Sequence, residues 1–230
     1  MKTILSTNKN KALTYMVVCA LSLTTFSCSK DDNPAPKNEE YAAKVMLKDG
    51  ETKNYITAST AKGTTGSVSR KGDLYSIKDF RQGTLNSAGT ALETANTVFY
   101  FNFKENDGAD ATTAQVTLNA TQRNMDIIPN TKDGYKLSYI NQAFNDVKAT
   151  DQFTELEKAG VSFGTGIGWA NYDVTVHHVV AAPNRTFVLT KDGKPVFKFR
   201  VISVYSGGMP NAARESTNYV FYSIDYQEFK

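Results

Sequence analysis

The chain of 230 residues has few of the side chains that most often carry out chemistry. It contains two cysteines, two histidines and one tryptophan. The cysteines, Cys19 and Cys28, both lie near the N-terminus, so residues 29–230 contain no thiol. Disulfide bonds, zinc sites built on thiolates and cysteine nucleophiles each need a cysteine sulfur, so they are excluded from the larger part of the chain.

The N-terminal segment 1–27 contains no acidic residue and has the pattern of a secretory signal peptide. Lys2, Lys9 and Lys11 give it a basic start, an apolar run follows, and small residues precede Cys28. The apolar run is too short for a membrane-spanning helix, which needs roughly 20 apolar residues. We predict that residues 1–27 are removed as a signal peptide.

A cysteine directly after the predicted cleavage position resembles the acylated cysteine of bacterial lipoproteins. Cys28 would carry the lipid, although Thr25 stands where leucine is commoner. An ordinary signal peptide followed by an unrelated cysteine is the alternative. Residues 28–40 are polar and proline-containing, which predicts a disordered tether. Asp31 and Asp32 resemble the surface-export signal of Bacteroidota lipoproteins, so we expect an outer-membrane, lipid-anchored protein on the cell surface.

The chain that remains after cleavage has no net charge. The full sequence has 26 Lys and Arg residues against 23 Asp and Glu residues, and the lysines of the signal peptide account for the difference. Phosphate binding needs clustered Lys and Arg side chains, and no long basic run follows the signal peptide. Nucleic acid is therefore not an expected partner, and the lipid anchor is the only membrane contact that we expect.

Residues 41–230 have the length of a single domain and are rich in β-branched and aromatic residues. Asp-Gly pairs ending at Gly50, Gly134 and Gly193 lie between apolar segments and predict tight turns, because glycine accepts a positive φ. We predict strands at 41–47, 52–58, 73–77, 97–104, 114–120, 134–140, 171–180, 185–190, 195–205 and 218–226.

One segment has the pattern of a helix. Asp151 is a candidate N-cap, Phe153 and Leu156 are three residues apart, and Gly160 stands where a helix commonly ends. We therefore predict an all-β fold, a single antiparallel sandwich or open-barrel-like domain with one short helix near residues 151–159.

No pattern of a catalytic site occurs in the sequence. The G-x-S-x-G motif that carries a serine nucleophile is absent. The glycine-rich stretch 164–168 lacks the preceding strand and following helix of a phosphate loop. The acidic stretch 105–110 is too short for a calcium loop and predicts a turn. We expect no enzyme activity.

His177 and His178 are adjacent within the predicted strand 171–180. Neighbouring residues of a strand point to opposite faces, so the two side chains would not hold one metal ion unless a bulge intervened. Each histidine is therefore a candidate ligand on its own. The alternative is that both are surface or hydrogen-bonded strand residues.

The methionines of the remaining chain are the other soft donors. Met125 lies in the polar stretch 121–130 and Met209 in a Gly/Pro-rich stretch, so both are expected in loops where they could be exposed. Met46 lies in a predicted strand and is expected in the core. Met125 and Met209 therefore join the histidines as candidate ligands.

Several features of the C-terminal half occur together in a known family. They are Gly-Trp at 168–169, Pro-Asn-Arg at 183–185, Asp-Gly at 192–193, a strand with basic residues ending at Tyr205, and an aromatic strand at 219–226. This combination resembles the HmuY-like haem-binding lipoproteins of Bacteroidota. The resemblance implies an all-β lipoprotein that acts in iron acquisition, binds haem as its cofactor or cargo, and passes it to a TonB-dependent outer-membrane receptor without catalysis.

The resemblance also implies a pair of axial iron ligands, two histidines in some members and two methionines in others. The adjacent histidines of this chain depart from the two-histidine pattern. A site that combines His177 or His178 with Met125 or Met209 is one alternative, and haem held between two copies of the chain is another. A protein that binds a different porphyrin or apolar ligand, or a surface module for a glycan or host protein, also fits the sequence.

Overall fold

The computed structural model describes residues 43–162, 167–208 and 220–230. The chain divides into two units, residues 1–40 and 41–230, and the described residues belong to the second. The buried hydrophobic side chains run from Val45 to Tyr226, so this unit has a core of its own and is expected to fold independently. The predicted signal peptide, Cys28 and the tether lie outside the described residues.

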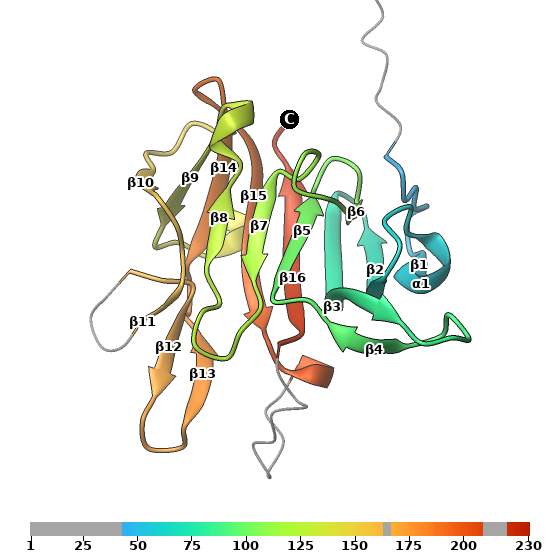
Figure 1. The fold of residues 1–230 in the computed structure, drawn as a ribbon. Coiled ribbons are helices and arrows are strands. Elements are labelled where there is room, and N and C mark those ends of the chain that lie inside the picture. The colour runs from blue at the N-terminus through green and yellow to red at the C-terminus, as the bar shows by residue number, and fades with distance from the viewer. Residues whose placement is uncertain (1–42, 163–166, 209–219) are drawn as a thin grey trace, which may run out of the picture. The chain divides into compact units, whose positions relative to one another are not determined.

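An antiparallel nine-stranded sheet forms the larger layer of the domain (Figure 1). The short strand β4 (Leu92–Ala95) pairs with β3 beside the main path of the sheet. The order along that path is β1 (Thr52–Asn54), β2 (Thr64–Lys71), β3 (Leu74–Leu85), β16 (Tyr222–Glu228), β15 (Lys194–Ser203), β14 (Thr186–Lys191), β9 (Tyr135–Ile140) and β10 (Thr154–Leu156).

Two smaller sheets complete the domain. A four-stranded sheet lies in front of the large one in Figure 1, and a three-stranded sheet ends in a hairpin that extends beyond both layers. The first has the order β6 (Asp107–Gly108), β5 (Val98–Asn102), β7 (Val116–Asn119) and β8 (Ile127–Pro129), and the second β11 (Val161–Ser162), β12 (Ala170–Asp173) and β13 (His178–Ala181). The helical elements are α1 (Tyr55–Ala58), η1 (Thr131–Asp133), η2 (Phe144–Asp146) and η3 (Ser206–Gly208).

Aromatic side chains fill the space between the two main layers. Alternation along β5 directs Phe99 and Phe101 to the same face, where both meet the edge of Phe80 from β3 at centroid distances of 6.0 and 5.3 Å. Phe103 stacks on Phe199 of β15 at 5.3 Å. These contacts join the small sheet to the large one, and the predicted all-β antiparallel sandwich is confirmed, with no closed barrel.

The predicted helix near residues 151–159 is wrong in its position. Residues 154–156 form β10, which pairs with β9 in antiparallel register, and Ala159 forms a bridge with Ile127. The edge of β9 offers backbone partners to this segment, and two apolar side chains are too few to favour a packed helix over that pairing. The short helix of the domain is α1, where the side chain of Asn54 accepts the N–H of Ile56.

The three predicted turn glycines all have positive φ, at 77°, 79° and 78° for Gly50, Gly134 and Gly193. Gly193 follows Asp192, which also has a positive φ, and the pair joins β14 to β15 as a hairpin. No helix within the described ranges combines the length and apolar character needed to cross a bilayer.

Candidate functional site

The segment that carries both histidines is a hairpin and not the single strand that its sequence predicts. β12 pairs with β13 up to the pair Asp173–His178, and residues 174–177 form the turn. The carboxylate of Asp173 accepts hydrogen bonds from the backbone N–H and the hydroxyl of Thr175, at 2.9 and 2.6 Å, which closes the turn. His177 has a φ of 56°, outside the strand region, so the assignment of the two histidines to opposite faces of one strand is wrong.

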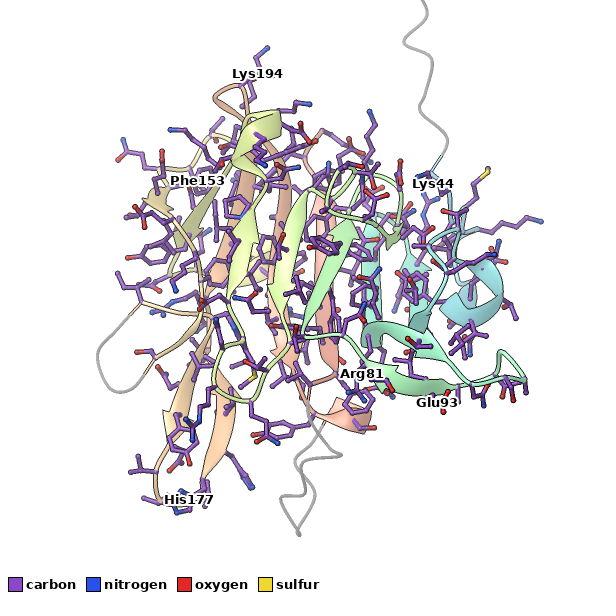
Figure 2. The ribbon with its side chains drawn as sticks, viewed as in Figure 1. Lys44, Arg81, Glu93, Phe153, His177 and Lys194 are labelled. Atoms are coloured by element: carbon purple, nitrogen blue, oxygen red, sulfur yellow. The ribbon has the colours of Figure 1, made fainter. Side chains whose placement is uncertain are left out.

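His177 lies at the far end of the hairpin, as Figure 2 shows, and is exposed to solvent. Its Nδ1 is 2.9 Å from the hydroxyl of Tyr172, which projects from β12. This hydrogen bond fixes the orientation of the imidazole ring. The other ring nitrogen, Nε2, is therefore the one available to a ligand.

His178 begins β13 and is half-buried. Its ring meets that of Tyr205 edge to face at 6.1 Å, and the hydroxyl of Tyr205 accepts the N–H of Val179 at 2.7 Å. The Nε2 atom of His178 is buried and has no hydrogen-bond partner in the part of the chain that the structure describes. A buried nitrogen without a partner costs free energy, so this atom would gain from a ligand or a water molecule.

Exposed aliphatic side chains lie in the hairpin that carries the histidines and on a strand that this hairpin contacts. Val174 is 65% exposed and Val176 is 40% exposed in the turn, and Val180 is exposed on β13. Ile202 is exposed on β15, the strand that β13 contacts. Exposed apolar groups concentrated in one region indicate an interaction site. We call Val174, Val176, Val180 and Ile202 the hairpin patch.

The structure does not bring Met125 to this patch. The side chain of Met125 is 3% exposed and belongs to the hydrophobic core, and its backbone carbonyl accepts the indole N–H of Trp169 at 2.7 Å. Its sulfur is therefore not accessible to a ligand at the hairpin without repacking of the core. Met209 lies outside the described residues. Met46, predicted in the core, is 64% exposed, because its neighbours Val45 and Leu47 are the residues of this segment that are buried in the core.

The Gly-Trp and Pro-Asn-Arg features build the base of the hairpin. The N–H of Trp169 donates to the carbonyl of Gly160, and a side chain at Gly168 would collide with that same carbonyl. Arg185 donates to the carbonyl of Gly168 at 2.8 Å and to the side chain of Asn141 at 3.0 Å. These residues hold the hairpin on the sandwich, and none of them is a candidate ligand.

A comparison with protein-family models finds no match for this chain, and a search of curated proteins finds none either. Across residues 43–162, 167–208 and 220–230, no three His, Cys, Asp or Glu side chains form a group that could hold a metal ion. The hairpin presents single histidines beside exposed apolar side chains.

Proposed function

We propose that the protein binds haem, or a related porphyrin, at the β12–β13 hairpin, with His177 as an iron ligand. The hydrogen bond between Tyr172 and Nδ1 of His177 carries the proposal. Histidines that coordinate metals commonly have their second ring nitrogen held by a hydrogen bond, which sets the ring orientation and strengthens the ligand. Tyr172 makes this contact with Nδ1, and His177 is exposed in the turn.

The hairpin patch supports a porphyrin as the ligand. A porphyrin has two broad apolar faces, and binding sites for such ligands are lined mainly by apolar side chains with a few placed polar groups. Val174 and Val176 lie in the same turn as His177 and supply apolar surface beside the imidazole. His178, with its unpartnered Nε2, is the alternative ligand from the same hairpin.

The protein is proposed to carry its ligand and not to transform it. Together with the predicted lipid anchor, an exposed site at the end of a hairpin fits a surface protein that collects haem and passes it to a TonB-dependent outer-membrane receptor. A ligand held from one side by few contacts dissociates faster than one enclosed in a cavity. Such a site would favour transfer over storage.

Titration of residues 41–230 with haemin, followed through the Soret band, tests the proposal. We expect His177→Ala to weaken haemin binding strongly. Tyr172→Phe should weaken it by roughly tenfold, because residues that hydrogen-bond to a metal ligand commonly contribute that much to metal affinity. His178→Ala tests the alternative ligand and should have the smaller effect. If the Soret band is unchanged with both oxidised and reduced haem, the protein does not bind haem. If His178→Ala has the larger effect, the ligand is His178.

A further inference from the structure

A cavity of about 450 Å³ opens on the side of the domain opposite the hairpin. Figure 2 shows Lys44, which lies at its edge, and His177 at opposite ends of the molecule. Its volume is within the range of about 300–1,000 Å³ that is typical of sites for small ligands. The cavity is lined by Lys44, Thr60, Ala61, Lys62, Gln82, Asn96, Tyr100, Gly108, Ala109, Asp110 and Thr113.

The floor of the cavity is fixed by Gln82, which is buried where the two main sheets meet. Its side-chain carbonyl accepts the N–H of Tyr100 at 2.7 Å, and its amide donates to the carbonyl of Ala109 at 3.1 Å. Gly108 completes the floor, because a side chain there would collide with Thr64 and Gln82. These contacts tie β3 to β5 and β6, so the cavity is formed before any ligand binds.

Several polar groups that line the cavity retain capacity for a ligand. Asp110 accepts all its described hydrogen bonds, from Thr112 and Thr113, through Oδ1, which leaves Oδ2 as an acceptor. Those bonds, with that of the Thr112 hydroxyl the largest cause, lower the pKa of Asp110 to about 2, so the carboxylate is ionised at neutral pH. Among the described residues, the side chains of Lys62 and Asn96 have no hydrogen-bond partner.

The charges around the cavity do not favour an ionic ligand. Lys44 pairs with Glu105 at 2.7 Å, and the lining includes both the carboxylate of Asp110 and the ammonium of Lys62. Asp107 is buried and accepts hydrogen bonds from the backbone N–H and the hydroxyl of Thr60, a residue of the lining. An anion would meet Asp110, and a cation would meet the two lysines. A hydroxyl group both donates and accepts, so it can use each side of this mixed set.

We propose that this cavity is a binding site for a neutral saccharide. Asp110, Asn96 and Lys62 would bind its hydroxyl groups, and the half-buried ring of Tyr100 would contact an apolar face of a sugar ring. The site lies away from the hairpin, and its ligand would bind whether or not haem is bound. The domain would then have two separate binding sites, one for haem and one for a saccharide.

Amide resonances of residues 41–230 can be followed by NMR during titration with maltohexaose, cellohexaose and mannohexaose, with hexagalacturonate as the charged counterpart. We expect at least one neutral hexamer to shift the resonances of Gly108, Ala109 and the Asn96 side chain. Hexagalacturonate should shift them less. The proposal is overturned if no neutral hexamer shifts these resonances, or if hexagalacturonate binds as well as the neutral hexamers.

Two pairs of variants test the assigned residues with the hexamer that binds. Tyr100→Leu should weaken binding by roughly five- to tenfold, whereas Tyr139→Leu, at another half-buried tyrosine outside the cavity, should not. Asn96→Ala should weaken it by roughly fivefold, and Asn171→Ala, on the exposed side of β12, should not. Equal effects within either pair would show that the saccharide binds elsewhere. None of the cavity variants should change the haemin titration.

Discussion

Asn106 is the residue at which a single substitution tests the hydrogen bonding of the core most directly. Its side-chain carbonyl accepts the hydroxyl of Tyr226 at 2.7 Å, and its amide donates to the carbonyl of Val45 at 3.2 Å. The hydroxyl of Tyr55 donates to its backbone carbonyl at 3.1 Å. Asn106 is buried and has a φ of 52°, a conformation that asparagine tolerates and alanine does not.

The substitutions Asn106→Gly and Asn106→Ala separate the hydrogen bonds from the backbone conformation. Both substitutions leave the hydroxyl of Tyr226 and the carbonyl of Val45 without hydrogen-bond partners. Each buried polar group that loses its partner costs about 1–3 kcal/mol of stability. We expect Asn106→Gly to lower the free energy of unfolding by about 2–4 kcal/mol. Asn106→Ala should lower it by about 1 kcal/mol more, because alanine disfavours the positive φ. The bond from Tyr55 uses the backbone and remains in both variants.

Urea unfolding of residues 41–230, followed by the fluorescence of Trp169, measures these changes. Tyr226→Phe alone should cost about 1–2 kcal/mol, since it removes the hydroxyl together with its need for a partner. Combined with Asn106→Gly it should cost less than the sum of the two, by about 1 kcal/mol or more. The reasoning is refuted if Asn106→Gly is as stable as the unmodified domain, or if the alanine variant is no less stable than the glycine variant.

Three further predictions concern the same domain. Burial raises the pKa values of Tyr55, Tyr222 and Tyr226 well above 10, so these hydroxyl groups ionise at lower pH in the unfolded chain than in the folded one. Each tyrosine should therefore lower the free energy of unfolding by roughly 1.4 kcal/mol per pH unit above about pH 10, and should have no such effect below it. A melting temperature that stays level between neutral pH and pH 11 would contradict this. Lys198 is 6% exposed and donates to the carbonyls of Phe144 and Val147, so Lys198→Met should cost about 1–3 kcal/mol in urea unfolding, whereas Lys132→Met on the surface should change little. Gly168→Ala should lower the free energy of unfolding by about 2 kcal/mol or more in the same assay, because the added methyl group would collide with the carbonyl of Gly160. An unchanged midpoint would show that the backbone at the base of the hairpin can shift to accommodate it.

The core of the sandwich was predictable because it depends on a period of two. Phe99 and Phe101 alternate with half-buried neighbours along β5. Along β15, Phe197, Phe199 and Val201 join the hydrophobic core as their spacing predicts, although Lys198 between them is buried as well. The position of the helix was not predictable from local spacing. Residues 151–160 carry the spacing of a helix, but the unpaired edge of β9 determines their structure, and that edge forms only when strands distant in sequence assemble.

The saccharide cavity had no signal in the sequence for a different reason. Its lining comes from Lys44, from residues 60–62 after α1, from β3, from the segment between β4 and β5, from β5, and from residues 108–113, and most of the side chains involved are ordinary polar ones. No one stretch has the spacing of a binding motif. The arrangement of donors around Gln82 arises only when β3 and β5 come together, so only the folded chain shows it.

The hairpin shows how one polar residue can redirect a run of strand-forming residues. Val174, Thr175 and Val176 are β-branched, and by propensity alone they extend the strand through both histidines. Asp173 overrides them, because its carboxylate binds Thr175 and ends β12 in a turn that the sequence does not mark with Asn-Gly or Asp-Gly. The consequence reaches the proposed function: the turn moves His177 out of the sheet, exposes the valines beside it, and brings its Nδ1 to Tyr172. If the turn closed by Asp173 positions His177 in this way, Asp173→Ala should weaken haemin binding, even though the Asp173 side chain makes no hydrogen bond to either histidine.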